Sequence, residues 1–154
     1  MSAEGVVISQ CRGEELPEIL RILAEAPEAA RWSKDALERV LGDTPEQFLL
    51  ARIGNEIVGF ILGRAVGLEA EILNLAVRKG FRRAGVGTEL VRMLLAENGI
   101  AGRRKTFLEV RESNGGAIAF YEGLGFQVVG RRPGYYREPV EAALVLLRDT
   151  CPKE

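Results

Sequence analysis

The chain has 154 residues, of which 47% are hydrophobic and 28% are charged, and its formal net charge at pH 7 is −1. This composition is ordinary for a globular protein, and the length suits a single domain over residues 1–154. The sequence contains no histidine, which excludes Ser/His/Asp and Cys/His catalysis and most zinc sites, so we expect no metal centre.

The N-terminus and the cysteines indicate the compartment. Residues 1–4 lack the basic and then apolar layout of a signal peptide, and no apolar run is long enough to span a membrane. Cys11 and Cys151 form neither a metal pattern nor a disulfide framework. We therefore expect a cytoplasmic protein, without membrane binding, in which both thiols are bystanders.

Charge is unevenly distributed along the chain. Residues 1–50 carry ten acidic against five basic side chains (−5), and residues 78–105 carry eight basic against two acidic (+6). A basic middle suits a polyanionic cofactor, and an acidic front suits a cationic substrate. The basic block lacks interleaved aromatic residues, so we do not expect nucleic acid as a partner.

The first half of the chain predicts two helices and four strands. Residues 5–9 form the first strand, and an apolar stripe predicts a helix over 16–24 that ends near Pro27. Ser33 is the expected N-cap of a second short helix, which Gly42 stops. A meander of three strands follows over 48–53, 57–64 and 69–77.

The second half alternates helices and strands. A helix is expected from Val86 to about Glu97, and another begins after an N-cap at Asn114 and ends at Gly125. Strands are expected over 106–110, 126–130 and 140–147, with a polar, aromatic loop over 131–139. This order predicts an α+β fold with a mixed central sheet flanked by helices.

Segment 82–88, Arg-Arg-Ala-Gly-Val-Gly-Thr, joins the apolar strand at 72–77 to a helix. A helix start presents unpaired N–H groups and the positive end of the helix dipole, and Gly85 and Gly87 keep Cβ atoms away from a ligand there. Further polar groups come from Thr88, Arg82 and Arg83. The segment therefore suits a phosphate or pyrophosphate, although a plain glycine-capped turn before a surface helix is the alternative.

Two common phosphate loops do not match this segment. The Walker pattern fails because Val86 stands where a lysine is needed, and the dinucleotide pattern fails because Leu90 stands in place of its third glycine. The segment does match Arg-x-x-Gly-x-Gly. In this it resembles the pyrophosphate-binding signature of the GNAT acetyltransferase superfamily.

A second motif strengthens this resemblance. From Asn114 the chain follows Asn-x-x-Ala-Ile-x-x-Tyr-x-x-x-Gly-Phe, so the likeness to the GNAT core extends over roughly residues 70–130. Within the superfamily the chain is most similar to the RimI-type enzymes, which acetylate the N-terminal alanine of a ribosomal protein. The segments that resemble them are Trp32-Ser33, 70–77, 82–88, 108–111, Asn114, Tyr121 and Tyr135-Tyr136.

The resemblance implies a fold and a set of roles. The strands at 72–77 and 105–110 would be parallel and splayed, so that the pantetheine arm of acetyl-CoA fills the gap between them. Glu109 would be the general base and Tyr121 the general acid, and Trp32 and Tyr135 would contact the acceptor. The expected cofactor residues are Leu75, Ala76, Val77, Arg82, Arg83, Ala84, Gly85, Val86, Gly87, Thr88 and Asn114.

Elementary chemistry is consistent with these roles. An α-amine has a pKa of about 8 and a lysine amine one of about 10.4, and attack on a thioester needs the neutral amine, so a carboxylate base helps. A phenol can protonate the leaving thiolate. Tyr121 stands two helical turns after Asn114 on the same helix face. Direct transfer needs no covalent enzyme intermediate.

Each residue also has a purely structural alternative. A glutamate at a strand end is commonly solvated or ion-paired, here with Arg111 nearby, and a tyrosine on an apolar helix face is commonly part of the core. Asn114 can act as a helix cap, and Trp32 and Tyr135 can be packing residues. Ala142 stands where related proteins often have an acidic residue, in a region that frames their peptide entrance.

The sequence therefore predicts an acetyl-CoA-dependent N-acetyltransferase that acts on a protein N-terminus, with a ribosomal protein as the best single candidate. A small-molecule amine acetyltransferase, for a polyamine or an antibiotic, is the enzymatic alternative. A non-catalytic acyl-CoA-binding module is the alternative from another class.

Overall fold

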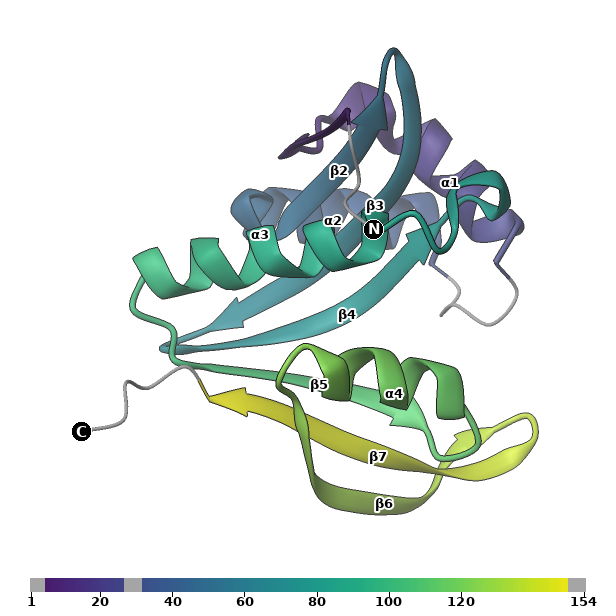
Figure 1. The fold of residues 1–154 in the computed structure, drawn as a ribbon, viewed down its shortest axis with the longest axis vertical. Coiled ribbons are helices and arrows are strands. Elements are labelled where there is room, and N and C mark those ends of the chain that lie inside the picture. The colour runs from purple at the N-terminus through teal and green to yellow at the C-terminus, as the bar shows by residue number, and fades with distance from the viewer. Residues whose placement is uncertain (1–4, 27–31, 150–154) are drawn as a thin grey trace.

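The computed structural model describes residues 5–26 and 32–149, and its strands form one seven-stranded sheet in the order β1-β2-β3-β4-β5-β7-β6 (Figure 1). The pairing is antiparallel except between β4 and β5, which confirms the predicted mixed sheet of an α+β fold. The strands are β1 (Val6–Gln10), β2 (Phe48–Ile53), β3 (Glu56–Val66), β4 (Glu69–Val77), β5 (Lys105–Arg111), β6 (Gln127–Arg137) and β7 (Val140–Asp149).

The helices begin at the caps that the sequence indicates. Ser33 Oγ accepts a hydrogen bond from the Ala36 N–H at 3.1 Å, and Asn114 Oδ1 accepts one from the Ala117 N–H, also at 3.1 Å. The helices are α1 (Leu16–Ala24), α2 (Lys34–Asp43), α3 (Val86–Ile100) and α4 (Gly115–Gly123). Pro27, the expected end of the first helix, and Cys151 lie outside the described residues. Within those residues, no helix combines the length and apolar character needed to cross a membrane.

Two helix ends differ from the prediction. Gly42 lies inside α2, which runs on to Asp43 before Pro45 opens a short 3₁₀ turn. Helix α3 passes the expected end at Glu97 because its last turn has a buried partner: Asn98, 1% exposed, accepts a hydrogen bond from the Gln47 side chain at 2.9 Å. Buried tertiary contacts therefore extend α3 beyond its local sequence signal.

The sheet separates two hydrophobic clusters. One cluster joins α3 and α4 to the strands through residues such as Leu90, Leu108 and Tyr121. The other joins α1 and α2 to the strands through residues such as Ile19 and Leu37. Figure 1 shows α3 crossing β4 and its neighbours, and α4 lying along β5 and β7. Each face of the sheet is thus covered by one pair of helices.

The parallel pair β4–β5 opens part-way along its length. Its pairing runs from Glu69↔Lys105 to Ile72↔Leu108 and stops there, although β4 continues to Val77 and β5 to Arg111 (Figure 1). Opposite β3, the register shifts at the same point, because Leu73 is an extra residue between Ile72 and Asn74. The splayed parallel pair predicted from the resemblance is confirmed.

The predicted loop over 131–139 is wrong, because β6 runs through to Arg137. Its register against β7 shifts between Arg132↔Ala143 and Tyr136↔Glu141, so residues 133–135 form a bulge in which Gly134 has a φ of 63°. The strand lies at the sheet edge, where proline is tolerated and one side of the backbone meets solvent. Most side chains of β6 are exposed, so its sequence shows no alternation of hydrophobic and polar residues that would predict a strand.

Candidate active site

The turn that precedes α3 leaves the helix start without a side-chain cap. Gly85 is the N-cap residue with a φ of 83°, and Arg83 has a φ of 64°, so the chain enters the helix through two left-handed positions. No side chain of the described residues accepts a hydrogen bond at this cap, whereas Asn114 caps α4. The first N–H groups of α3 therefore suit an anionic ligand.

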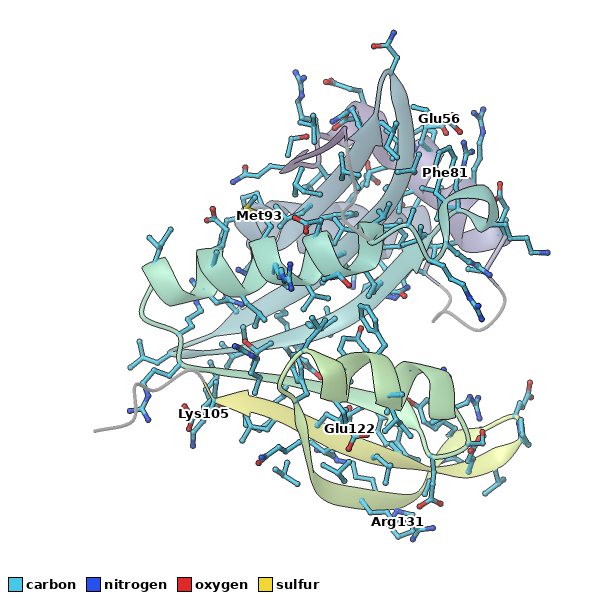
Figure 2. All side chains as sticks on the ribbon, viewed as in Figure 1. Glu56, Phe81, Met93, Lys105, Glu122 and Arg131 are labelled. Carbon is cyan, nitrogen blue, oxygen red and sulfur yellow. The ribbon has the colours of Figure 1, made fainter. Side chains whose placement is uncertain are left out.

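A pocket of about 660 Å³ lies against this helix start. It is lined by the end of β4, the turn before α3, and the first residues of α3 and α4. Every residue predicted to contact the cofactor lines it except Ala84. The sequence analysis missed four further lining residues. Gly116, Ala117 and Phe120 lie within the motif that begins at Asn114, and Phe81 lies in the turn before α3. Phe81 is labelled in Figure 2 on the turn between β4 and α3.

Gly87 lies beside the Phe120 side chain of α4. A Cβ atom added at Gly87 would lie 3.4 Å from Phe120 Cζ, in van der Waals contact with the ring. A small residue leaves the helix start open beside this ring. The pocket thus combines a free helix start with two glycines and nearby arginines, which fits a pyrophosphate group.

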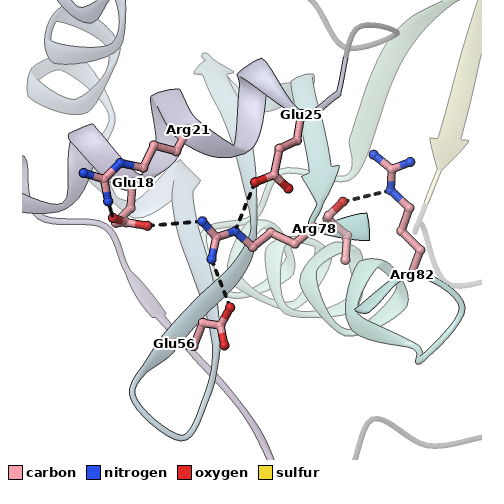
Figure 3. A network of polar contacts seen from close by, with 7 residues as sticks. Glu18, Arg21, Glu25, Glu56, Arg78 and Arg82 are labelled. Carbon is pink, nitrogen blue, oxygen red and sulfur yellow. Dashed lines mark hydrogen bonds and ion pairs between the residues drawn. The ribbon is translucent and has the colours of Figure 1, made fainter. Parts of the chain in front are cut away.

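One predicted backbone contact already has a partner within the chain. Arg82 Nε donates a hydrogen bond to the Val77 carbonyl at 2.9 Å, as Figure 3 shows. The Val77 carbonyl can therefore accept a bond from a pantetheine group only by sharing with Arg82 or displacing it. Of the two arginines in the turn, Arg82 folds back on the strand end.

Glu109 and Tyr121 lie on opposite faces of the sheet. On β5, Glu109 alternates with Leu108 and Val110, which pack into the cluster beneath α3 and α4, so Glu109 faces the other way. Tyr121 belongs to that cluster and is 7% exposed. Neither residue lines the pocket at the helix start. Sequence reasoning had not predicted this separation.

The Glu109 side chain lines a second pocket, of about 350 Å³. Its other linings include Glu69, Glu71 and Arg132. Arg132 Nε lies 3.1 Å from the Glu109 Oε2 atom, so the ion-pair partner is Arg132 rather than Arg111. The Tyr135 hydroxyl comes within hydrogen-bonding reach of Glu109, and this carboxylate is the main reason that the pKa of Tyr135 is raised.

Tyr121 is held by aromatic neighbours. Its ring packs edge-on against Phe120 at 5.0 Å and against Phe126 at 5.4 Å between centroids. Burial raises the pKa of Tyr121 well above its ordinary value near 10, so the phenol keeps its proton at neutral pH.

The remaining predicted residues have simpler surroundings. Trp32 is half-buried and packs against the cluster beneath α1 and α2, whereas Tyr135 is 46% exposed.

Burial raises the pKa of the Cys11 thiol to about 12, which keeps that thiol protonated. Within residues 5–26 and 32–149, no three acidic or cysteine side chains are placed so that together they could hold a metal ion.

Comparison with known proteins decides the family. The family model described as "Acetyltransferase (GNAT) family" matches residues 15–126, which include the turn before α3, Glu109 and Tyr121. The chain belongs to the GNAT acetyltransferase family.

Comparison with individual proteins shows which enzymes within the GNAT family this chain is similar to. N-alpha-acetyltransferase RimI of Mycobacterium tuberculosis is 34% identical over 125 residues, covering 77% of this chain and 76% of the relative. The ribosomal protein bS18-alanine N-acetyltransferase of Escherichia coli K12 is 34% identical over 129 residues, covering 84% and 86%. The solved structure of Ard1 from Thermoplasma volcanium superposes with a TM-score of 0.88 at 28% identity, covering 96% and 99%. The predicted likeness to RimI-type enzymes is confirmed, and the protein is an acetyl-CoA-dependent N-acetyltransferase.

An ion cluster anchors the turn of this GNAT acetyltransferase at its base. Arg78, the first residue after β4, lies 3.0 Å from Glu56, 3.6 Å from Glu18 and 3.9 Å from Glu25, and its side chain is 20% exposed (Figure 3). Its backbone N–H also donates to the Val58 carbonyl at 2.8 Å. One guanidinium therefore ties the start of the turn to α1 and to the β2–β3 hairpin.

Replacing Arg78 with methionine should lower the free energy of unfolding by about 1–3 kcal/mol, because three partly shielded carboxylates lose their shared cation. Urea unfolding followed by circular dichroism measures this change. Arg21→Met is the matched control, since Arg21 pairs with Glu18 at the surface and should cost less than about 1 kcal/mol. Equal effects of the two substitutions would show that the Arg78 cluster behaves as an ordinary surface ion pair.

Proposed function

We propose that this enzyme transfers the acetyl group of acetyl-CoA directly to the N-terminal α-amine of a protein, with the N-terminal alanine of a ribosomal protein as the first candidate. The main structural support is the opening between β4 and β5, which has the anion-suited pocket on one side and the Glu109 carboxylate on the other. The two curated relatives described above, each 34% identical, are named as an N-alpha- and an alanine N-acetyltransferase. A ribosomal acceptor agrees with the cytoplasm expected from the sequence.

In this proposal the larger pocket holds acetyl-CoA. The N–H groups at the start of α3 would bind the pyrophosphate together with Arg83 and Thr88, and Asn114 would contact the cofactor while it caps α4. The strand end at Leu75 and Ala76 would pair with the pantetheine arm as an added strand does. The thioester would then lie in the opening, between the two faces of the sheet.

Glu109 would act as the general base. A carboxylate has about four acceptor positions, so its contacts with Arg132 and Tyr135 leave room for the acceptor amine or a bridging water. The amine nitrogen bonds to the acetyl carbon and its proton passes to Glu109, while the carbon–sulfur bond breaks. The proton finally neutralises the thiolate, so the products are the acetylated amine and free CoA.

Tyr121 would assist the departing sulfur from the other face. An alkyl thiol has a pKa of about 8.5, below that of the phenol, and burial raises the pKa of Tyr121 further, so complete proton transfer to the thiolate is uphill. We therefore assign Tyr121 the donation of a hydrogen bond to the sulfur as negative charge develops there. Such stabilisation needs a protonated phenol in a fixed position.

One observation favours a second candidate function. The pocket beside Glu109 is also lined by Glu69 and Glu71, and three carboxylates in one pocket suit a cationic small amine as well as a protein N-terminus. A polyamine or aminoglycoside acetyltransferase would use the same Glu109 and Tyr121 chemistry.

Free-thiol release from acetyl-CoA, measured with two acceptor sets, separates these candidates. One set holds short peptides that differ in their first residue, including ribosomal-protein N-termini from the source organism, and the other holds polyamines and aminoglycosides. We expect turnover with alanine-led peptides. Turnover with the small amines alone would show that the acceptor is a small amine and not a protein N-terminus. Tight cofactor binding without turnover on either set would favour an acyl-CoA-binding module.

Replacing Gly87 with glutamate should abolish acetyl-CoA binding, because a side chain and a negative charge would stand between Phe120 and the pyrophosphate position. Titration calorimetry measures the affinity. The matched control is Gly99→Glu, the same change at the far end of α3, where an added Cβ meets no atom within 4 Å. An unchanged affinity for acetyl-CoA in Gly87→Glu would show that this turn does not bind the cofactor.

Tyr121→Phe should lower kcat by about a hundredfold and leave the Kd for acetyl-CoA nearly unchanged, because the ring keeps its packing and loses only the hydrogen-bond donor. Steady-state kinetics and calorimetry measure the two quantities. Tyr136→Phe removes the same group from β6 and should keep kcat, since its ring remains under the Arg111 guanidinium. A full kcat in Tyr121→Phe would show that another group, or water, donates the hydrogen bond to the departing sulfur.

A further inference from the structure

Two side chains of the edge strand β6 reach the Glu109 carboxylate on β5. Arg132 Nε lies 3.1 Å from Glu109 Oε2, and the Tyr135 hydroxyl comes within hydrogen-bonding reach of the same carboxylate. The Arg132 guanidinium also lies 5.7 Å from the centre of the Tyr135 ring. Glu109, at 17% side-chain exposure, is therefore held on two sides by residues of a single strand.

The sheet register explains why Arg132 can reach so far. Glu109 pairs with Val145 on β7, and Val145 pairs with Gly130 on β6, so β6 and β5 are two strand spacings apart, or about 10 Å. Arg132 stands two residues beyond Gly130 on the same face of the sheet. The long Arg132 side chain spans this separation to reach Glu109, and Val145 lines the same pocket as both residues.

The bulge after Arg132 brings the second side chain to the carboxylate. Residues 133–135 leave the regular pairing with β7, and Gly134 takes a left-handed conformation with a φ of 63°. The bulge thus turns the Tyr135 side chain toward Glu109 instead of leaving it in the alternation of a flat edge strand.

A second arginine, Arg111 on β5, fixes the end of β6 onto β5. The Arg111 guanidinium donates to the carbonyls of Pro139 at 3.2 Å and Glu138 at 3.3 Å, and it pairs with Glu141 at 3.2 Å. It also lies 4.2 Å from the centre of the Tyr136 ring. The turn between β6 and β7 is thereby tied to the strand that bears Glu109, which limits movement of the bulge relative to the carboxylate.

We propose that Arg132 and Tyr135 are positioning residues that hold the Glu109 carboxylate toward the opening between β4 and β5. This inference rests on the proposed function, because it takes Glu109 as the base. Arg132 orients one oxygen by charge, and Tyr135 restrains the carboxylate by a hydrogen bond. Both act through Glu109 on the acceptor amine, and neither contacts the cofactor pocket.

The two partners restrict how the base can move. A glutamate side chain has several rotatable bonds, and a base displaced by about 1 Å can lose about a hundredfold in rate. The contacts with Arg132 and Tyr135 select one orientation before the acceptor arrives. Loss of Arg132 should therefore lower kcat while the KM for acetyl-CoA stays the same.

Arg132→Met and Arg132→Lys test this inference with whichever acceptor supports turnover in the wild type. Arg132→Met should lower kcat by about tenfold to a hundredfold, and Arg132→Lys should restore part of the loss because it keeps the charge. Arg131→Met is the matched control. Arg131 is the preceding residue, pairs with Glu112 at 2.8 Å and points away from the sheet edge in Figure 2, so this variant should keep its kcat.

A double-mutant comparison separates positioning from direct contact with the acceptor. In a Glu109→Gln background, Arg132→Met should cause no further loss, because its effect passes through the missing carboxylate. The same loss in both backgrounds, or an unchanged or raised kcat in Arg132→Met alone, would overturn the inference. A full kcat in Glu109→Gln would instead overturn the proposed base, so the two failures differ. Because the Arg132 side chain is 61% exposed, the variant should fold, which thermal unfolding checks.

Discussion

The rest of the structure depends on the early end of the β4–β5 pairing. The two strands pair from Glu69↔Lys105 to Ile72↔Leu108 and then separate, while β3 holds β4 and β7 holds β5 from outside. Because each separating strand keeps one paired edge, the sheet opens at its centre without losing its continuity. The opening leaves the end of β4 unpaired on the side of β5, and this strand end lines the pocket at the start of α3.

The two sides of this opening differ in chemistry. The side toward α3 and α4 consists of a helix start, strand backbone and two glycines, and its buried phenol keeps its proton. The other side consists of ionisable side chains, with Glu109 between Arg132 and Tyr135 and with Glu71 paired to Arg64. Backbone groups suit a cofactor that is the same molecule in every turnover. Ionisable side chains suit an acceptor amine that changes its protonation state during the reaction.

The sequence was sufficient where the signal was local. Residues 82–88 and Asn114 are adjacent to the strand and helix that position them, so the turn, the cap and the helix start could be predicted from spacing alone. The faces on which Glu109 and Tyr121 lie could not, because they depend on strand alternation and on the packing of α4. The contact of Glu109 with Arg132 was also out of reach, since it follows from the register of β5, β7 and β6. The loop predicted over 131–139 belongs to β6 as far as Arg137, and the sequence does not reveal this because an exposed edge strand has no alternating apolar pattern.

The position of β6 also bears on how enzymes of this kind can diversify. Within the described sheet β6 pairs with β7 alone, at the edge farthest from β1, yet two of its side chains reach Glu109 on β5. Substitutions and bulges in an edge strand disturb few core contacts, so natural selection can alter this strand at little cost to folding. With Glu109 in the role proposed above, the site for the acetyl donor can stay constant over evolutionary time while substitutions in this peripheral strand change the acceptor.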